Sequence, residues 1–172
     1  MSNTDLTRFG GATAIVAGVL RAIGSVVPTT GSVVLLQLLY FLTDLALLIA
    51  IMALYTKHHR EVGTTGLIGF LLSVLGILVI RSSNIVPGIY LYPLGALVFS
   101  VGLNVLGIKL WRVRALPGWV AGFWVMSILA DIAVSLAHVA VLALLAGLLL
   151  AAGFVGAGLR QRPRDPTIEP VA

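Results

Sequence analysis

Residues 33–55 read VVLLQLLYFLTDLALLIAIMALY, and their composition decides the fold class. Asp44 is the one charged residue in this stretch, and nearly all of the other side chains are apolar. A hydrocarbon core about 30 Å thick is crossed by roughly 20 apolar residues in a helix. The stretch therefore predicts a transmembrane helix with a carboxylate near its middle.

The whole chain has the same character. Of its 172 residues, 59% are apolar and 10% are charged, and the mean hydropathy is +1.10. A soluble domain has about 45–50% apolar and about 25% charged residues. We therefore expect an all-α, polytopic membrane helix bundle that contacts the lipid bilayer of the cell membrane, which in a bacterium is the inner membrane.

Six apolar runs are long enough to cross a bilayer, which predicts a six-helix transmembrane domain over residues 9–160. The expected spans are 9–27, 33–55, 64–80, 88–110, 117–134 and 137–159. The last two lie in one apolar stretch, 116–159, which as a single helix would be about 66 Å long and would exceed any bilayer. We expect the break at residues 131–138, where polar side chains cluster.

The basic residues indicate the orientation. All 11 lysines and arginines except Arg21 and Arg81 fall in the tails or at loops on one side of the expected membrane. Because cytoplasmic loops are enriched in such residues, we expect residues 1–8 and 161–172 to be cytoplasmic tails and the spans to form three consecutive hairpins. Prolines among charges predict that the second tail is disordered. The basic residues lie in short clusters between apolar runs, which argues against nucleic acid as a partner despite the net charge of +5.

Polar groups in the second span form the first candidate site. An ionisable side chain inside a membrane costs on the order of several kcal/mol, so Asp44 is a functional hypothesis by default. Gln37 and Tyr40 precede it by seven and four residues and share its helical face. Arg21, on the first span, is expected about one turn nearer the outer surface and within reach of Asp44. This pair either fixes the register of two helices or belongs to a site for a solute or a proton.

A second candidate site lies at the outer surface. Asp131 and His138 are seven residues apart, and Arg81 and Asn84 belong to the neighbouring outer loop. These four residues could line a vestibule in which the histidine titrates near neutral pH. The alternative is that Asp131 and His138 are helix-terminus residues at the water boundary, where an aspartate satisfies free backbone amides.

Small residues at four-residue spacing predict close helix packing. The two rows are Gly10, Ala14, Gly18 and Ala22 on the first span and Ala143, Gly147 and Ala151 on the last. They indicate a compact bundle, or else a face for a second copy or another membrane subunit. Asn104 and Ser100 share a face of the fourth span and predict interhelical hydrogen bonds.

Local signatures of catalysis are missing from the sequence. It has no cysteine, no Gly-x-Ser-x-Gly elbow, no P-loop, no dinucleotide fingerprint and no zinc-protease histidine spacing. We therefore expect no metal and no cofactor, and the sequence does not support an enzymatic activity. Two classes remain, namely a binding or transport protein for a small solute or lipid, and a non-catalytic accessory or scaffold subunit of a membrane complex.

Overall fold

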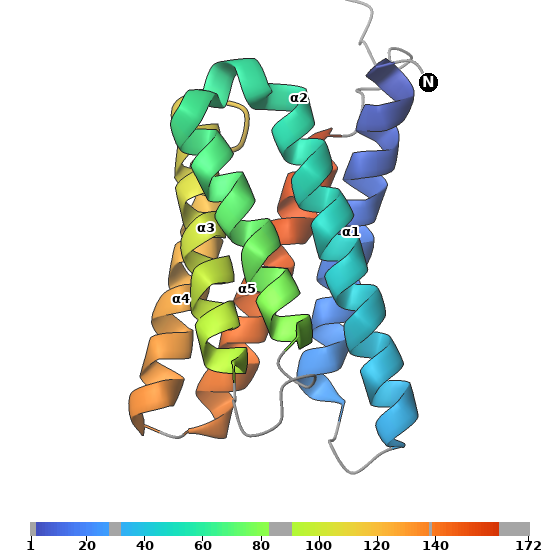
Figure 1. The fold of residues 1–172 in the computed structure, drawn as a ribbon, viewed down its shortest axis with the longest axis vertical. Coiled ribbons are helices and arrows are strands. Elements are labelled where there is room, and N and C mark those ends of the chain that lie inside the picture. The colour runs from blue at the N-terminus through green and yellow to red at the C-terminus, as the bar shows by residue number, and fades with distance from the viewer. Residues whose placement is uncertain (1–2, 28–31, 83–90, 138, 162–172) are drawn as a thin grey trace, which may run out of the picture.

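The computed structural model describes residues 3–27, 32–82, 91–137 and 139–161 and folds them into five helices (Figure 1). They are α1 (Asn3–Val26), α2 (Val33–Ser82), α3 (Tyr92–Arg112), α4 (Gly118–Ala137) and α5 (Ala140–Gln161). An apolar chain favours helices because each helix satisfies its own backbone N–H and C=O groups. None of the described residues is in a strand, so the all-α prediction is confirmed.

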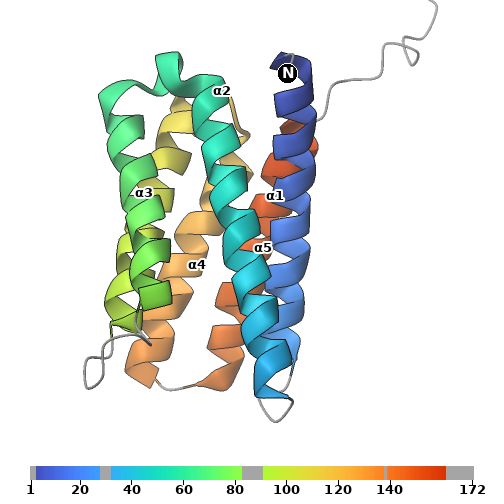
Figure 2. The same cartoon turned by 45° about the vertical axis from the view of Figure 1, so that its right-hand side comes forward.

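The helices form a closed ring in chain order. Each helix packs against the next one along the chain, and α5 packs back against α1 (Figure 2). Large apolar side chains fill the interior, and among them Leu54, Trp124 and Phe154 are fully buried. The rings of Trp124 and Phe154 lie 5.3 Å apart between their centroids. The core is therefore the packed interior of the ring.

The prediction of six separate helices in three hairpins is not confirmed. Its second and third spans belong to one 50-residue element, α2, which Gly63 interrupts with φ 59° and ψ −159°. At this residue the ribbon turns, so that a first limb (residues 33–62) and a second limb (residues 64–82) run in opposite directions along the bundle (Figure 1). The expected loop at residues 56–63 stays helical up to the glycine because none of the residues before Gly63 breaks a helix.

Several helices have the length and composition that a membrane crossing requires. Suitable stretches occur in α1, α2, α3 and α5, and α4 has a shorter apolar stretch, Gly118–Val134. The last two helices separate between Ala137 and Ala140, at the end of the region where the break was expected. Helix α1 begins at Asn3, six residues before the expected span.

The two ends of the bundle differ in charge. The start of α1, the turn at Gly63 and the end of α5 lie together at the top of Figure 1, and we call this the basic end. The lysine and arginine side chains that the structure describes there are those of Lys57, Arg60, Lys109, Arg112, Arg114 and Arg160. The opposite end, where α1 and α4 finish, is called the far end.

Glycines bring α1 and α5 into close contact. A Cβ atom at Gly18 would lie 2.6 Å from the backbone oxygen of Ala151, and one at Gly158 would lie 2.5 Å from the backbone oxygen of Gly11. Both distances are too short for a side chain, so only glycine permits this approach. Gly18 and Ala151, members of the two predicted small-residue rows, thus pack against each other within the chain, whereas Gly10 of the first row faces Ala53 of α2.

Gly63→Ala is expected to destabilise the protein by about 1–3 kcal/mol, because this backbone conformation is adopted without strain only by glycine. Steric room is not the cause, since a Cβ there would meet no atom within 4 Å. Gly122→Ala is the matched control, because that Cβ also meets no atom within 4 Å but the backbone is helical. Thermal unfolding in detergent should show a lower midpoint for Gly63→Ala only, and equal midpoints would contradict the turn.

Candidate functional site

Four charged side chains gather towards the far end of the bundle. Arg21 comes from α1, Asp44 and Arg81 come from the two limbs of α2, and Asp131 comes from α4. We call these residues the charged cluster. Among the charged side chains that the structure describes, they are the ones that lie outside the basic end.

Asp44 forms an ion pair with Arg81. The distance from Arg81 Nη2 to Asp44 Oδ2 is 2.6 Å, and the two side chains are 35% and 20% exposed, respectively. The guanidinium of Arg81 also lies over the ring of Phe41, with 5.7 Å between Cζ and the ring centroid. This charge-assisted contact joins the two limbs of α2 near the far end, away from their covalent connection at Gly63.

The structure thus pairs Asp44 with Arg81 and not with Arg21, the partner that the sequence suggested. The prediction compared depths in a hairpin of the first two spans, but the turn at Gly63 returns the end of α2 to its own first limb and supplies a nearer cation, Arg81. Arg21 still interacts electrostatically with both Asp44 and Asp131. The two sites that the sequence suggested separately thus share one cluster.

Arg21 presents a donor to the interior of the bundle. Its Nε atom is buried and has no hydrogen-bond acceptor among the described residues. The side chain runs beside α5 at Gly147, where a Cβ would lie 4.0 Å from Nε. The hydroxyl of Ser25, one turn further along α1, donates to the backbone oxygen of Arg21 at 2.9 Å. Arg21 therefore lies between α1 and α5 with one donor open to an additional acceptor.

The vestibule residues are only partly in their expected places. Asp131 is exposed and lies inside α4, six residues before its end at Ala137, so it is not the helix-terminus residue that the alternative assumed. The helix continues past it because no glycine or proline follows before Ala137. Arg81 belongs to the last turn of α2 rather than to a loop. Asn84 and His138 lie outside the described residues.

Gln37 and Tyr40 are exposed on the first limb of α2. The ring of Tyr40 lies against α1 at Gly24, where a Cβ would be 3.3 Å from its Cε1 atom. The buried polar residue of this region is Thr43, whose hydroxyl donates to the backbone oxygen of Leu39 at 2.7 Å. Gln37 and Tyr40 thus have the helical spacing that relates them to Asp44, but their side chains do not enter the core.

Two polar side chains connect neighbouring helices. The amide of Asn104 on α3 donates to the backbone oxygen of Trp124 on α4 at 3.3 Å, which confirms the predicted interhelical hydrogen bond for this residue. The buried hydroxyl of Ser127 on α4 donates to the backbone oxygen of Ala146 on α5 at 3.0 Å. The sequence places Ser127 on the same helical face as Asp131, but it does not indicate that the hydroxyl binds a backbone oxygen of α5.

No protein-family model, no curated protein and no solved structure matches this chain. Within the described part of the chain, no group of three His, Cys, Asp or Glu residues is placed to hold a metal ion. Function is therefore inferred from the charged cluster and its surroundings.

A double-mutant cycle is expected to detect the Asp44 and Arg81 pair. Asp44→Asn should destabilise the protein in detergent by leaving Arg81 without its partner, and adding Arg81→Gln should recover about 1–3 kcal/mol of that loss. The matched comparison combines Asp44→Asn with Arg21→Gln, which should show much weaker coupling because Arg21 acts at longer range. Stronger coupling of Asp44 to Arg21 than to Arg81 would overturn the assignment.

Proposed function

We propose that the protein crosses the cell membrane with six helical segments and has both termini in the cytoplasm. The segments are α1, the two limbs of α2, α3, α4 and α5. The second limb of α2, residues 64–82, is about 28 Å long, close to the thickness of a hydrocarbon core. The described basic side chains outside the charged cluster all lie at one end of the bundle, as they do at cytoplasmic ends of membrane proteins.

Introduced cysteines are expected to report this topology, because the chain has no cysteine of its own. In intact cells, a membrane-impermeant thiol reagent should label Ser32→Cys and Ser82→Cys, which lie at the far end, and should spare His59→Cys at the basic end until the membrane is permeabilised. Labelling of His59→Cys in intact cells would contradict the orientation. Labelling of Ser32→Cys and Ser82→Cys from opposite sides would contradict the turn in α2.

We further propose that the charged cluster binds a small solute that carries a carboxylate or phosphate oxygen. The observation that supports this proposal is the buried Nε of Arg21, which has no acceptor among the described residues. A buried donor left unsatisfied costs roughly 1–3 kcal/mol, so an acceptor oxygen from outside the chain would bind favourably there. Arg81 also has a buried Nε without an acceptor in the described part of the chain, but its guanidinium is paired with Asp44, so Arg21 is the residue that we expect to receive the solute.

The surroundings of Arg21 support the same assignment. Gly147 adds no side chain to the space beside the guanidinium, and Ser25 places a hydroxyl against the same glycine. In a low dielectric, a guanidinium binds an anionic oxygen more strongly than it does in water. Transport would add to this binding step a second conformation that opens towards the other side of the membrane.

The alternative function, an accessory or scaffold subunit, would need small-residue faces that are free to dock other helices. The Gly18 face of α1 meets Ala151 and Val155 of α5, and the Gly147 face of α5 meets Ser25 of α1. Both faces are thus occupied within the chain. They offer no support for a docking role.

Thiol modification is expected to show whether aqueous anions reach Arg21. In vesicles, Ser25→Cys should react faster with a negatively charged methanethiosulfonate than with a positively charged one, because Arg21 attracts the anionic reagent. Adding Arg21→Gln should reduce this ratio by about fivefold to tenfold, which corresponds to the loss of one nearby charge in a partly screened site. Ala17→Cys, at a fully buried position about two turns away on α1, is the matched control and should not react.

An unreactive Ser25→Cys would mean that water and solutes do not reach Arg21, and the binding proposal would be wrong. Equal reaction rates for the two reagents would show an accessible site without anion preference, which would also contradict it. The control at Ala17 excludes general loosening of the bundle as the reason for reactivity.

A further inference from the structure

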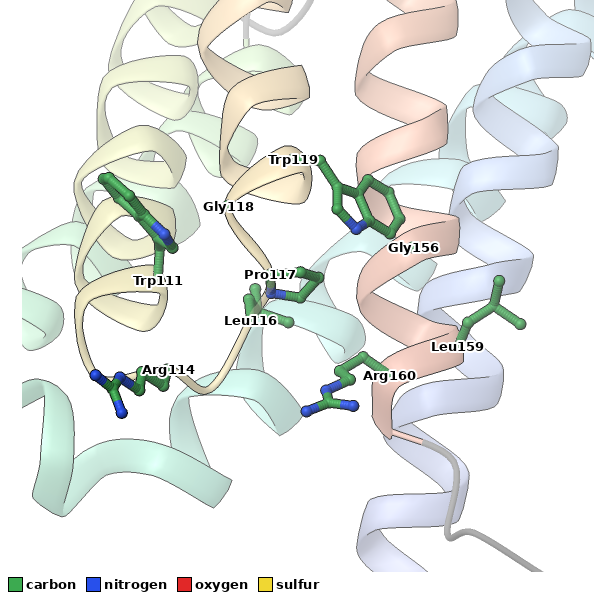
Figure 3. Close-up of a pocket in the computed structure, with 9 residues that line it drawn as sticks. All are labelled: Trp111, Arg114, Leu116, Pro117, Gly118, Trp119, Gly156, Leu159 and Arg160. Atoms are coloured by element: carbon green, nitrogen blue, oxygen red, sulfur yellow. The ribbon is translucent and has the colours of Figure 1, made fainter.

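We propose that a pocket at the basic end binds the phosphate headgroup of an anionic lipid. The pocket has a volume of about 610 Å³ and lies between the turn that joins α3 to α4 and the last turns of α5 (Figure 3). Its charged residues are Arg114 and Arg160, and its aromatic residues are Trp111 and Trp119. Arginines between helix ends on the cytoplasmic side are the usual receptors for anionic headgroups.

The side chains are arranged as a lipid at the membrane surface would require. In Figure 3 the two guanidinium groups lie on the side of the pocket nearer the end of the bundle, and the two indoles lie further along the helices. Tryptophan prefers this interfacial depth because its ring is apolar and its N–H is polar. Phosphate at the arginines would therefore place the glycerol and the first acyl carbons beside the indoles.

Each indole rests on a glycine. The Trp111 ring lies against Gly118, where a Cβ would be 2.9 Å from Nε1, and the Trp119 ring lies against Gly156, where a Cβ would overlap the ring. Trp119 is also held by an edge contact to Phe123, with 5.7 Å between the ring centroids. Both rings are about half exposed, at 51% and 52%. The walls of the pocket are thus fixed by packing while their outer faces remain free to contact a ligand.

Arg114 has the left-handed conformation that glycine usually adopts where a helix ends in this way. Its φ is 60°, and it follows the C-cap residue Val113. The amide of Ala115 donates to the backbone oxygen of Leu110, and the amide of Arg114 donates to that of Trp111, both at 2.9 Å. This pattern is the Schellman motif, in which the left-handed residue is usually glycine because other side chains are strained there. The strained residue here is one of the two cations of the pocket, and such strain is often found at functional positions.

Among the side chains that the structure describes at the basic end, the basic groups outnumber the acidic ones. Its described acidic residue is Glu61, which contacts His58 with 3.2 Å between Oε2 and Nδ1. No described carboxylate forms an ion pair with Arg114 or Arg160, so both guanidinium groups are open to an added anion. This inference depends on membrane insertion but not on solute binding at Arg21, which lies towards the opposite end.

The test uses the full chain in phosphatidylcholine vesicles that contain a minority of brominated lipid, because bromine quenches tryptophan fluorescence on contact. Brominated phosphatidylglycerol should quench more than the same fraction of brominated phosphatidylcholine. In the variant Arg114→Gln with Arg160→Gln, this preference should fall by about fivefold for each arginine. The matched control is Lys57→Gln with Arg60→Gln, which removes the same charge from exposed positions of the same end outside the pocket and should keep the preference.

A further variant separates binding from folding. Arg114→Gly should lose the preference for phosphatidylglycerol to the same extent as Arg114→Gln, while its thermal midpoint rises because glycine relieves the left-handed strain. Quenching that falls equally in the pocket variant and in the control would show general attraction to the basic end and overturn the proposed site. If inorganic phosphate at millimolar concentration relieves the quenching, the pocket binds a soluble phosphate, and the proposal that it binds a lipid headgroup is wrong.

Discussion

Gly63 is the residue at which α2 leaves the helical conformation, and the arrangement of the charged groups depends on that departure. A straight helix of 50 residues would be about 75 Å long, more than twice the thickness of a hydrocarbon core. The turn converts this length into two limbs of opposite direction. As a result, Arg81 reaches Asp44, although the two residues are far apart in sequence. The ring of helices can then close through the contact of α5 with α1.

The ion pair and the glycine turn hold the same two limbs at different places. Gly63 connects them covalently at the basic end, and the Asp44 and Arg81 contact joins them towards the far end. Asp44 is thereby engaged within α2. Arg21 belongs to a different helix, packs beside Gly147 of α5, and keeps a buried Nε without an acceptor among the described residues. The cluster therefore separates into a structural pair and a cation that is available for binding.

The helical fold followed from composition, because continuous apolar runs of about 20 residues satisfy their own backbone groups as helices. The break between α4 and α5 also fell close to its expected place. The partner of Asp44 could not be predicted in the same way. The position of a residue within a span gives its depth, but it does not say which helices are neighbours. The left-handed conformation of Arg114 could not be predicted either. A glycine at this position would have indicated the turn, but the chain has an arginine there.

The arginines at the two ends of the molecule have different electrostatic surroundings. In the charged cluster, Arg21 and Arg81 are matched by Asp44 and Asp131, so an anionic solute there competes with the chain's own carboxylates. At the basic end, the described acidic residue Glu61 is engaged with a histidine. Selectivity at the cluster then depends on the local charge of Arg21 and on the fit around it, because the net charge of the four side chains cancels. At the basic end, attraction of anions is set by the excess of positive charge, and the two indoles decide where a headgroup binds.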